Sequence, residues 1–108
     1  MTTREERLAE NEVVFREVNE QIAEIGVRFE LETVSALCEC VSASCTERFE
    51  LSRASYAQVR SSSVRFVVVP GHEKLDVETV VDELEGYFVV EKIGVGARVA
   101  EQRDEGSR

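Results

Sequence analysis

Three cysteines lie within a short segment of this chain, Cys38, Cys40 and Cys45, and they constrain its fold more than any other feature. An odd number of cysteines leaves no complete set of disulfides, and clustered thiols in a reducing compartment are typical of metal binding. A structural zinc ion takes four tetrahedral ligands, mostly sulfur and nitrogen, so a fourth ligand is needed. The only histidine is His72. We therefore predict a zinc knuckle in which the metal is bound by Cys38, Cys40, Cys45 and His72.

The residues before His72 support this prediction. Val69-Pro70-Gly71-His72 has proline second and glycine third, as a type II turn favours. Such a turn would redirect the chain after a strand and could direct the imidazole at the cysteines. Four protein ligands would close the coordination shell and leave no place for water, so we expect a structural zinc rather than a catalytic one. Another thiophilic ion such as iron would suit the same donors.

The spacing of the first two cysteines is the main argument against a metal site. Cys38 and Cys40 share one face only if the strand that carries them is regular, and their sulfurs then need a bend to converge on one ion. The segment from Val41 to Ser44 has no glycine to ease that bend. The alternative is three reduced cysteines in the core and a histidine on the surface, because free cysteine is often buried.

The charge of the chain excludes some classes of partner. It has 22 acidic and 13 basic residues and a net charge of −9, so the basic surface expected of a nucleic-acid-binding protein is missing, and binding to an anionic membrane is disfavoured. The charged N-terminus is not followed by an apolar run, which argues against a secretory signal. No apolar run is long enough to span a membrane. We expect a cytoplasmic protein, for which a protein partner remains open.

Residue patterning predicts one α+β domain over residues 1–100, with a long N-terminal helix and a small, mostly antiparallel sheet. Thr3 and Glu6 fit a capping box, and the helical pattern runs from residue 3 to about 25, with Gly26 as its C-cap. Along this helix a set of mostly apolar residues recurs every three or four positions and forms a seam on one face. The seam either packs on the sheet of its own chain or forms a homodimer in which Asn11 fixes the register. The seam residues are Leu8, Asn11, Phe15, Val18, Ile22 and Ile25.

The rest of the chain is predicted to contain short strands and one middle helix. We expect extended segments at 29–34, 36–41 and 47–51, and a helix capped by Ser52 that ends near residue 60. The β-branched segment 64–69 is expected to be the central strand. Residues 76–84 fit a helix or a hairpin with 87–93, and we favour the hairpin. Residues 101–108 are expected to be a polar, disordered tail.

Several motifs together resemble a group of small, uncharacterised bacterial proteins, over most of the chain from about Phe15. In that group a Cys-Glu-Cys-x4-Cys knuckle and a Pro-Gly-His turn occur together, which implies that the three cysteines and His72 act as one site. No function is established for the group, so the resemblance implies nothing about activity. The matching motifs are Cys38-Glu-Cys40 with Cys45, Tyr56-x-x-Val59-Arg60, Phe66-Val-Val-x-Pro70-Gly71-His72-Glu73, Val80-Val81 and Val89-Val90-Glu91-Lys92.

Three functions fit the sequence. The favoured one is a small zinc-stabilised interaction or regulatory protein that meets a protein partner, or a second copy, through its N-terminal helix. The alternative is a thiol redox sensor, in which oxidation of the cysteines releases zinc. An enzyme that uses zinc or Cys45 is disfavoured, because no residue pattern supplies an oxyanion hole or an orienting group beside Cys45 and His72.

Overall fold

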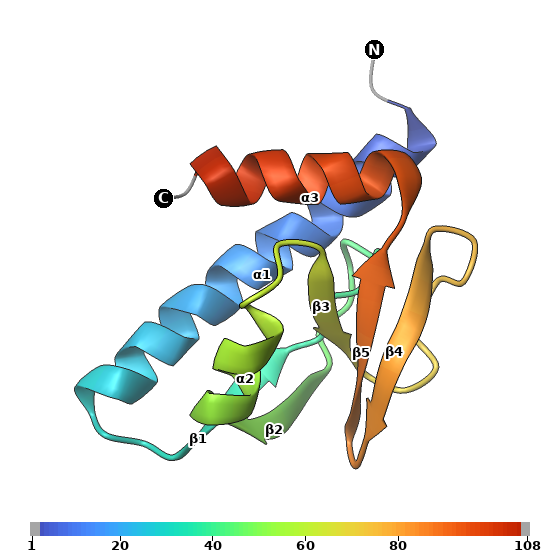
Figure 1. Cartoon of the computed structure of the whole chain (residues 1–108). Helices are drawn as coiled ribbons and strands as arrows, with labels where there is room; N and C mark the ends of the chain where they lie inside the picture. The colour runs from blue at the N-terminus through green and yellow to red at the C-terminus, as the bar shows by residue number, and fades with distance from the viewer. Residues whose placement is uncertain (1–2, 107–108) are drawn as a thin grey trace.

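A computed structural model describes residues 3–106 and has the expected α+β architecture, with a long N-terminal helix, small antiparallel sheets and a short middle helix. Two helices, α1 and α3, pack across each other on one side of the molecule, and the strands lie on the other (Figure 1). The elements are α1 (Arg4–Arg28), β1 (Thr33–Leu37), β2 (Arg48–Ser52), α2 (Arg53–Val59), β3 (Arg65–Val68), β4 (Glu78–Leu84), β5 (Tyr87–Lys92) and α3 (Gly94–Gly106).

The strands form two antiparallel sheets rather than one. Strands β1 and β2 pair with each other, and β3, β5 and β4 form a second sheet in that order. The favoured hairpin is confirmed, because β4 and β5 pair antiparallel with Leu84 opposite Tyr87. The prediction that segment 64–69 is central is wrong within this sheet, where β5 is the middle strand. The outer edge of β3 is instead covered by the cysteine segment, since the Glu39 N–H donates to the Val67 carbonyl at 2.7 Å.

Helix α1 begins as predicted but ends later. Thr3 and Glu6 form the capping box. The helix continues past Gly26 to Arg28, and Phe29 is its C-cap, so the prediction that Gly26 ends the helix is wrong. The glycine is needed for a different reason: a Cβ atom at residue 26 would lie 2.8 Å from Cγ1 of Val34. Gly26 therefore allows α1 to pack closely against β1.

The face of α1 that packs on the core coincides with the predicted seam only in part, and Ile22 is a seam residue that does pack there. Val18 and Ile25 of the seam are 38% and 49% exposed. The first interpretation of the seam, packing on the chain's own sheet, is therefore wrong for these two residues. A helix needs apolar residues on its inner face only where no polar partners are present, and here several inner residues are polar and bonded to other elements. The buried residues of α1 are Ala9, Glu12, Val13, Arg16, Asn19 and Gly26.

The C-terminal segment is helical, which corrects the expectation of a disordered tail for residues 101–106; residues 107 and 108 lie outside the described part of the chain. Ala100 is fully buried, and Arg103 forms ion pairs with Glu10 at 2.9 Å and with Glu17 at 3.1 Å. Asp104 pairs with Arg60 at 2.6 Å. These contacts attach α3 to α1 and to the end of α2, which residue patterning alone did not indicate.

The core lies between α1 and the two sheets, and Phe66, Val67, Val68 and Val90 are its fully buried centre. The middle helix α2 is capped by the Ser52 hydroxyl, which accepts from the Ser55 N–H, as predicted. Among the described residues, no helix is both long and apolar enough to cross a membrane.

Candidate metal centre

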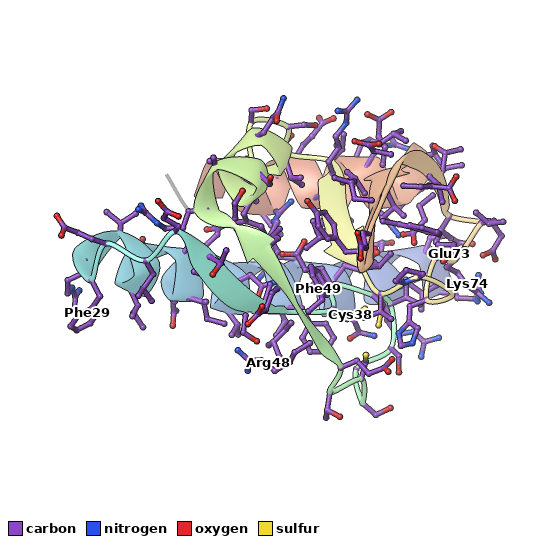
Figure 2. All side chains as sticks on the ribbon, turned by 90° about the horizontal axis from the view of Figure 1, so that it is seen from below. Phe29, Cys38, Arg48, Phe49, Glu73 and Lys74 are labelled. Atoms are coloured by element: carbon purple, nitrogen blue, oxygen red, sulfur yellow. The ribbon has the colours of Figure 1, made fainter. Side chains whose placement is uncertain are left out.

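The structure brings together the four side chains that the sequence analysis selected. Cys38 and Cys40 follow β1, Cys45 precedes β2, and His72 follows β3. One ligand atom from each, the three Sγ atoms and a ring nitrogen, lies within 4.8 Å of every other. All three cysteines are free thiols. Figure 2 shows Cys38 beside the loop that carries Glu73 and Lys74, just after His72.

The separations of these atoms suit a tetrahedral ion. The Nδ1 atom of His72 lies 3.6 Å from Sγ of Cys38 and 3.6 Å from Sγ of Cys45. A zinc ion bound at the usual Zn–N and Zn–S distances would place such a nitrogen and sulfur about 3.6 Å apart. The cluster could therefore hold a metal ion with small movements of the side chains, and Nδ1 is the imidazole atom that would bind it.

The Cys-x-Cys spacing is accommodated by regular alternation of side chains. Cys38 and Cys40 are both buried and belong to the same cluster, while Glu39 between them is directed to other partners in the core. The bend that the sequence seemed to lack comes after them, where the Cys45 N–H donates to the Ser42 carbonyl at 3.1 Å. That turn brings Cys45 back to the first two cysteines without a glycine.

Glu39 holds the cysteine segment in place, a role that sequence analysis missed. Its carboxylate is completely buried and accepts hydrogen bonds from Asn19 Nδ2 at 2.8 Å, the Tyr56 hydroxyl at 2.8 Å and the Val67 N–H at 3.0 Å. Burial raises the pKa of Glu39, and these three donors oppose that rise. One indication of this role was present in the sequence, since Glu39 lies between two candidate ligands in a segment predicted to be a strand.

Two asparagines of α1 fix the same segment at its ends. Asn19 donates to the Leu37 carbonyl and accepts from the Leu37 N–H, each at 2.8 Å. Asn11 donates to the Val41 carbonyl at 2.8 Å. The Asn11 amide, which we considered as a polar residue in a dimer seam, is therefore used within the chain. Residues 37–41 are thus held at both ends against α1.

The turn before His72 has the predicted form. The His72 N–H donates to the Val69 carbonyl at 2.9 Å, and Gly71 has φ +95°, as the third residue of a type II turn requires. The Val69 N–H in turn donates to Sγ of Cys38 at 3.1 Å, so the end of β3 contacts a candidate ligand directly. Backbone donors of this kind stabilise a thiolate.

Glu47 is a second residue that sequence analysis missed. Its Oε2 atom lies 2.5 Å from Nε2 of His72, on the side of the ring away from the cysteines. A carboxylate at Nε2 keeps the proton there, which leaves Nδ1 with a free lone pair for a metal. The spacing Cys45-x-Glu47 gave no indication of this contact, because it depends on the turn that positions His72.

In the absence of metal, the three thiols differ in pKa. The hydrogen bond between Cys38 and Cys40 lowers the pKa of Cys40 to about 5, with His72 acting in the same direction. The same hydrogen bond, with burial, raises the pKa of Cys38, and burial raises that of Cys45. The cluster therefore holds one thiolate readily, and a bound cation would be needed to ionise the other two thiols.

Comparisons with protein-family models, with curated proteins and with solved structures find no match for this chain. The resemblance to small bacterial proteins with the same cysteine and histidine motifs therefore stays an expectation. The argument for a metal centre depends on the arrangement of the four side chains and their hydrogen-bond partners.

Proposed function

We propose that this chain is a zinc-binding protein in which the metal is structural and stabilises a small interaction or regulatory domain. The observation that supports this most directly is the convergence of three thiols and one imidazole nitrogen from two separate loops within 4.8 Å. Three sulfur ligands and one nitrogen ligand, all from the protein, are typical of structural zinc and leave no position for a substrate or water.

The position of the cluster explains what a metal would contribute. Cys38, Cys40 and Cys45 belong to the connection between β1 and β2, and His72 belongs to the connection between β3 and β4. A bound ion would therefore join the two sheets, which do not pair with each other as ladders. A chain of 108 residues has a modest core, and a metal cross-link is a common supplement in domains of about this size or smaller.

The first experiment is to measure the metal content of protein purified without added metal, by elemental mass spectrometry. We expect about one zinc per chain, and its loss in both Cys38→Ser and His72→Ala. Glu73→Gln is a matched control, because Glu73 lies next to His72 but its carboxylate accepts from the Gly71 N–H at 2.7 Å and does not belong to the cluster of candidate ligands. A wild-type protein that folds without any metal and keeps free thiols would contradict the proposal.

Chelation tests the structural role separately from binding. Removing zinc should lower the melting temperature and expose both loops to proteolysis, because the metal-free protein loses the metal cross-link between the two loops. Refilling with cobalt should restore stability and give a thiolate-to-cobalt charge-transfer band that is missing in Cys38→Ser. An unchanged melting temperature after complete removal of zinc would contradict a structural role.

The exposure of Cys45 supports the redox sensor as a second candidate. Cys38 and Cys40 are buried, whereas Cys45 and His72 are partly exposed. An oxidant would therefore reach Cys45 first, and oxidation of a ligand thiolate would weaken zinc binding. Release of zinc by mild peroxide, reversed by a thiol reductant and zinc, would favour this role. Retention of zinc under the same treatment would exclude it.

A further inference from the structure

Helix α1 and its C-cap carry four large apolar residues whose side chains are exposed. Val14, Val18, Ile25 and Phe29 are 50%, 38%, 49% and 66% exposed. Their steps of four, seven and four residues place them on one side of a helix, roughly opposite the buried residues of α1. In Figure 2, Phe29 lies at the far end of α1, away from the other labelled residues. We call these four residues the outer stripe.

The outer stripe is unusual for the surface of a strongly acidic chain. It continues into Leu31, which is 47% exposed, so the apolar surface extends from the middle of α1 into the turn before β1. An apolar face of this kind on an otherwise charged helix is typical of an interface with another helix. Its β-branched residues are poorly suited to a role in helix formation alone, because they lower helix propensity.

We propose that a second copy of this chain covers the outer stripe, with the two α1 helices antiparallel and related by a two-fold axis that passes beside residues 19 and 20. In this arrangement Val14 lies opposite the partner's Ile25, and Val18 lies closer to the two-fold axis. The pair of Val14 and Ile25 occurs twice, as an isologous interface requires. The antiparallel direction also places the helix dipoles favourably.

The charged residues beside the outer stripe favour an antiparallel arrangement of the two α1 helices over a parallel one. Arg28 and Glu10 lie on the same flank of the stripe, and the two-fold axis brings Arg28 opposite the partner's Glu10. Arg7, at the other end, comes opposite the turn that carries Glu30 and Glu32 of the partner subunit. Among the described side chains, those of residues 3–104, Arg7 and Arg28 form no ion pair, while Glu10 already contacts Arg103. A parallel dimer would instead place Arg28 and the partner's Arg28 at the same level on opposite flanks, far from either Glu10.

The mass of the zinc-loaded protein in solution tests this interface, by sedimentation equilibrium over a range of concentrations. We expect a reversible dimer for the wild type. Val18→Glu combined with Ile25→Glu should raise the dissociation constant at least about 100-fold, because each substitution buries a charge twice in the interface. Val27→Glu is the matched control, since Val27 is a valine of α1 with 60% exposure that lies outside the stripe. It should leave the dimer intact.

Photo-crosslinking tests the direction of the helices. A photoreactive amino acid at position 25 should crosslink to peptides that contain residue 14 of the partner. A crosslink between the two copies of position 25 would overturn the antiparallel arrangement. A wild-type protein that stays monomeric at high concentration, or a double variant that dimerises like the control, would overturn the interface itself. Either result leaves the proposed zinc site unaffected, because the inference does not depend on it.

Discussion

A buried carboxylate between two candidate ligands positions the candidate metal centre. The Glu39 side chain takes the place of a backbone carbonyl beside β3, because its Oε1 accepts the Val67 N–H while its own N–H donates to the Val67 carbonyl. Its other oxygen joins Asn19 of α1 to Tyr56 of α2. One residue thus connects three elements and fixes the direction of the cysteines on either side of it.

The first prediction at this scale is that Glu39→Gln destabilises the protein. An amide has one acceptor oxygen where the carboxylate has two, so either the Val67 N–H or the pair Asn19 and Tyr56 loses its acceptor. We expect a loss of about 1–3 kcal/mol in the free energy of unfolding, measured with urea on zinc-loaded protein. Glu85→Gln in the exposed β4–β5 turn is the control. Equal stability of the two variants would show that the network does not depend on the carboxylate.

The second prediction concerns Glu47 and the affinity for metal. Glu47→Gln should weaken zinc binding about 10-fold or more, because the imidazole of His72 loses the carboxylate that orients it and fixes its tautomer. The measurement is competition with a chromogenic chelator. Glu50→Gln, exposed on β2, controls for the change in net charge. Unchanged affinity in Glu47→Gln would mean that the contact with His72 does not persist once metal is bound.

At the scale of elements, the close contact between α1 and β1 depends on one glycine. A Cβ at Gly26 would lie 2.8 Å from Cγ1 of Val34 and 3.0 Å from Cδ of Arg53. Alanine is the better helix former by about 1 kcal/mol, so propensity and packing oppose each other at this position. Packing should prevail, because Val34 is β-branched, buried and has few alternative rotamers.

We therefore predict that Gly26→Ala lowers the free energy of unfolding by up to about 2 kcal/mol, despite its higher helix propensity. A double-mutant cycle with Val34→Ala tests the cause. In the Val34→Ala background the clash is relieved, so the same Gly26→Ala change should become neutral or stabilising. If its cost were the same in both backgrounds, the close approach to Val34 would not be the reason for glycine at position 26.

The elements with strong local signals were predictable from the sequence. The capping box at Thr3, the Ser52 cap, the turn before His72 and the β4–β5 hairpin depend on neighbouring residues, and the structure contains each of them. The features that were wrong depend on contacts between distant residues. Helix α3 is held by ion pairs from Arg103 to α1. Within the described part of the chain, strand β3 has no second strand beside it, because the Glu39 segment occupies its outer side.

The candidate site divides in the same way. The four candidate ligands were predictable because cysteine and histidine are scarce in this chain and have distinctive metal chemistry. Glu39 and Glu47 were not predictable, because the chain has 22 acidic residues and sequence spacing does not indicate which of them become partners in the fold. The role of Asn19 was not predictable either, because it depends on the same contacts between distant residues. Supporting residues of a metal centre are defined by the tertiary structure that they help to stabilise.

At the scale of the whole molecule, a second buried cluster joins the elements on the side of α1 nearest to α3. Lys92 of β5 lies 2.6 Å from Oε1 of Glu12 on α1 and 3.5 Å from Oε1 of Glu78 on β4, and all three side chains are fully buried. Gly96 of α3 makes room for the lysine, because a Cβ there would lie 2.8 Å from Cε of Lys92. Two carboxyl groups and one ammonium group are neutral together only if one carboxyl keeps its proton.

The raised pKa of Glu12 favours this carboxyl as the one that keeps the proton. Burial raises the pKa of Glu12 well above its ordinary value, the neighbouring carboxyl group of Glu78 adds to the rise, and Lys92 opposes it. An unfolded glutamate ionises near pH 4.3, so between that pH and the raised pKa the folded protein binds more protons than the unfolded one. The stabilisation is complete below this window and is lost as the pH rises through it, by up to about 1.4 kcal/mol per pH unit for one proton.

The final prediction is that Glu12→Gln removes this loss of stability with rising pH. Glutamine keeps the shape and a donor toward Glu78 but has no proton to lose, so its free energy of unfolding should be flatter than that of the wild type. Urea titrations of zinc-loaded protein between roughly pH 6.5 and pH 8.5 measure the two slopes under conditions in which bound thiolates stay deprotonated. Glu83→Gln, exposed on β4, should keep the wild-type slope. If Glu12→Gln also kept it, the cluster would hold two ionised carboxylates, and its net negative charge would have to be balanced by groups other than Lys92.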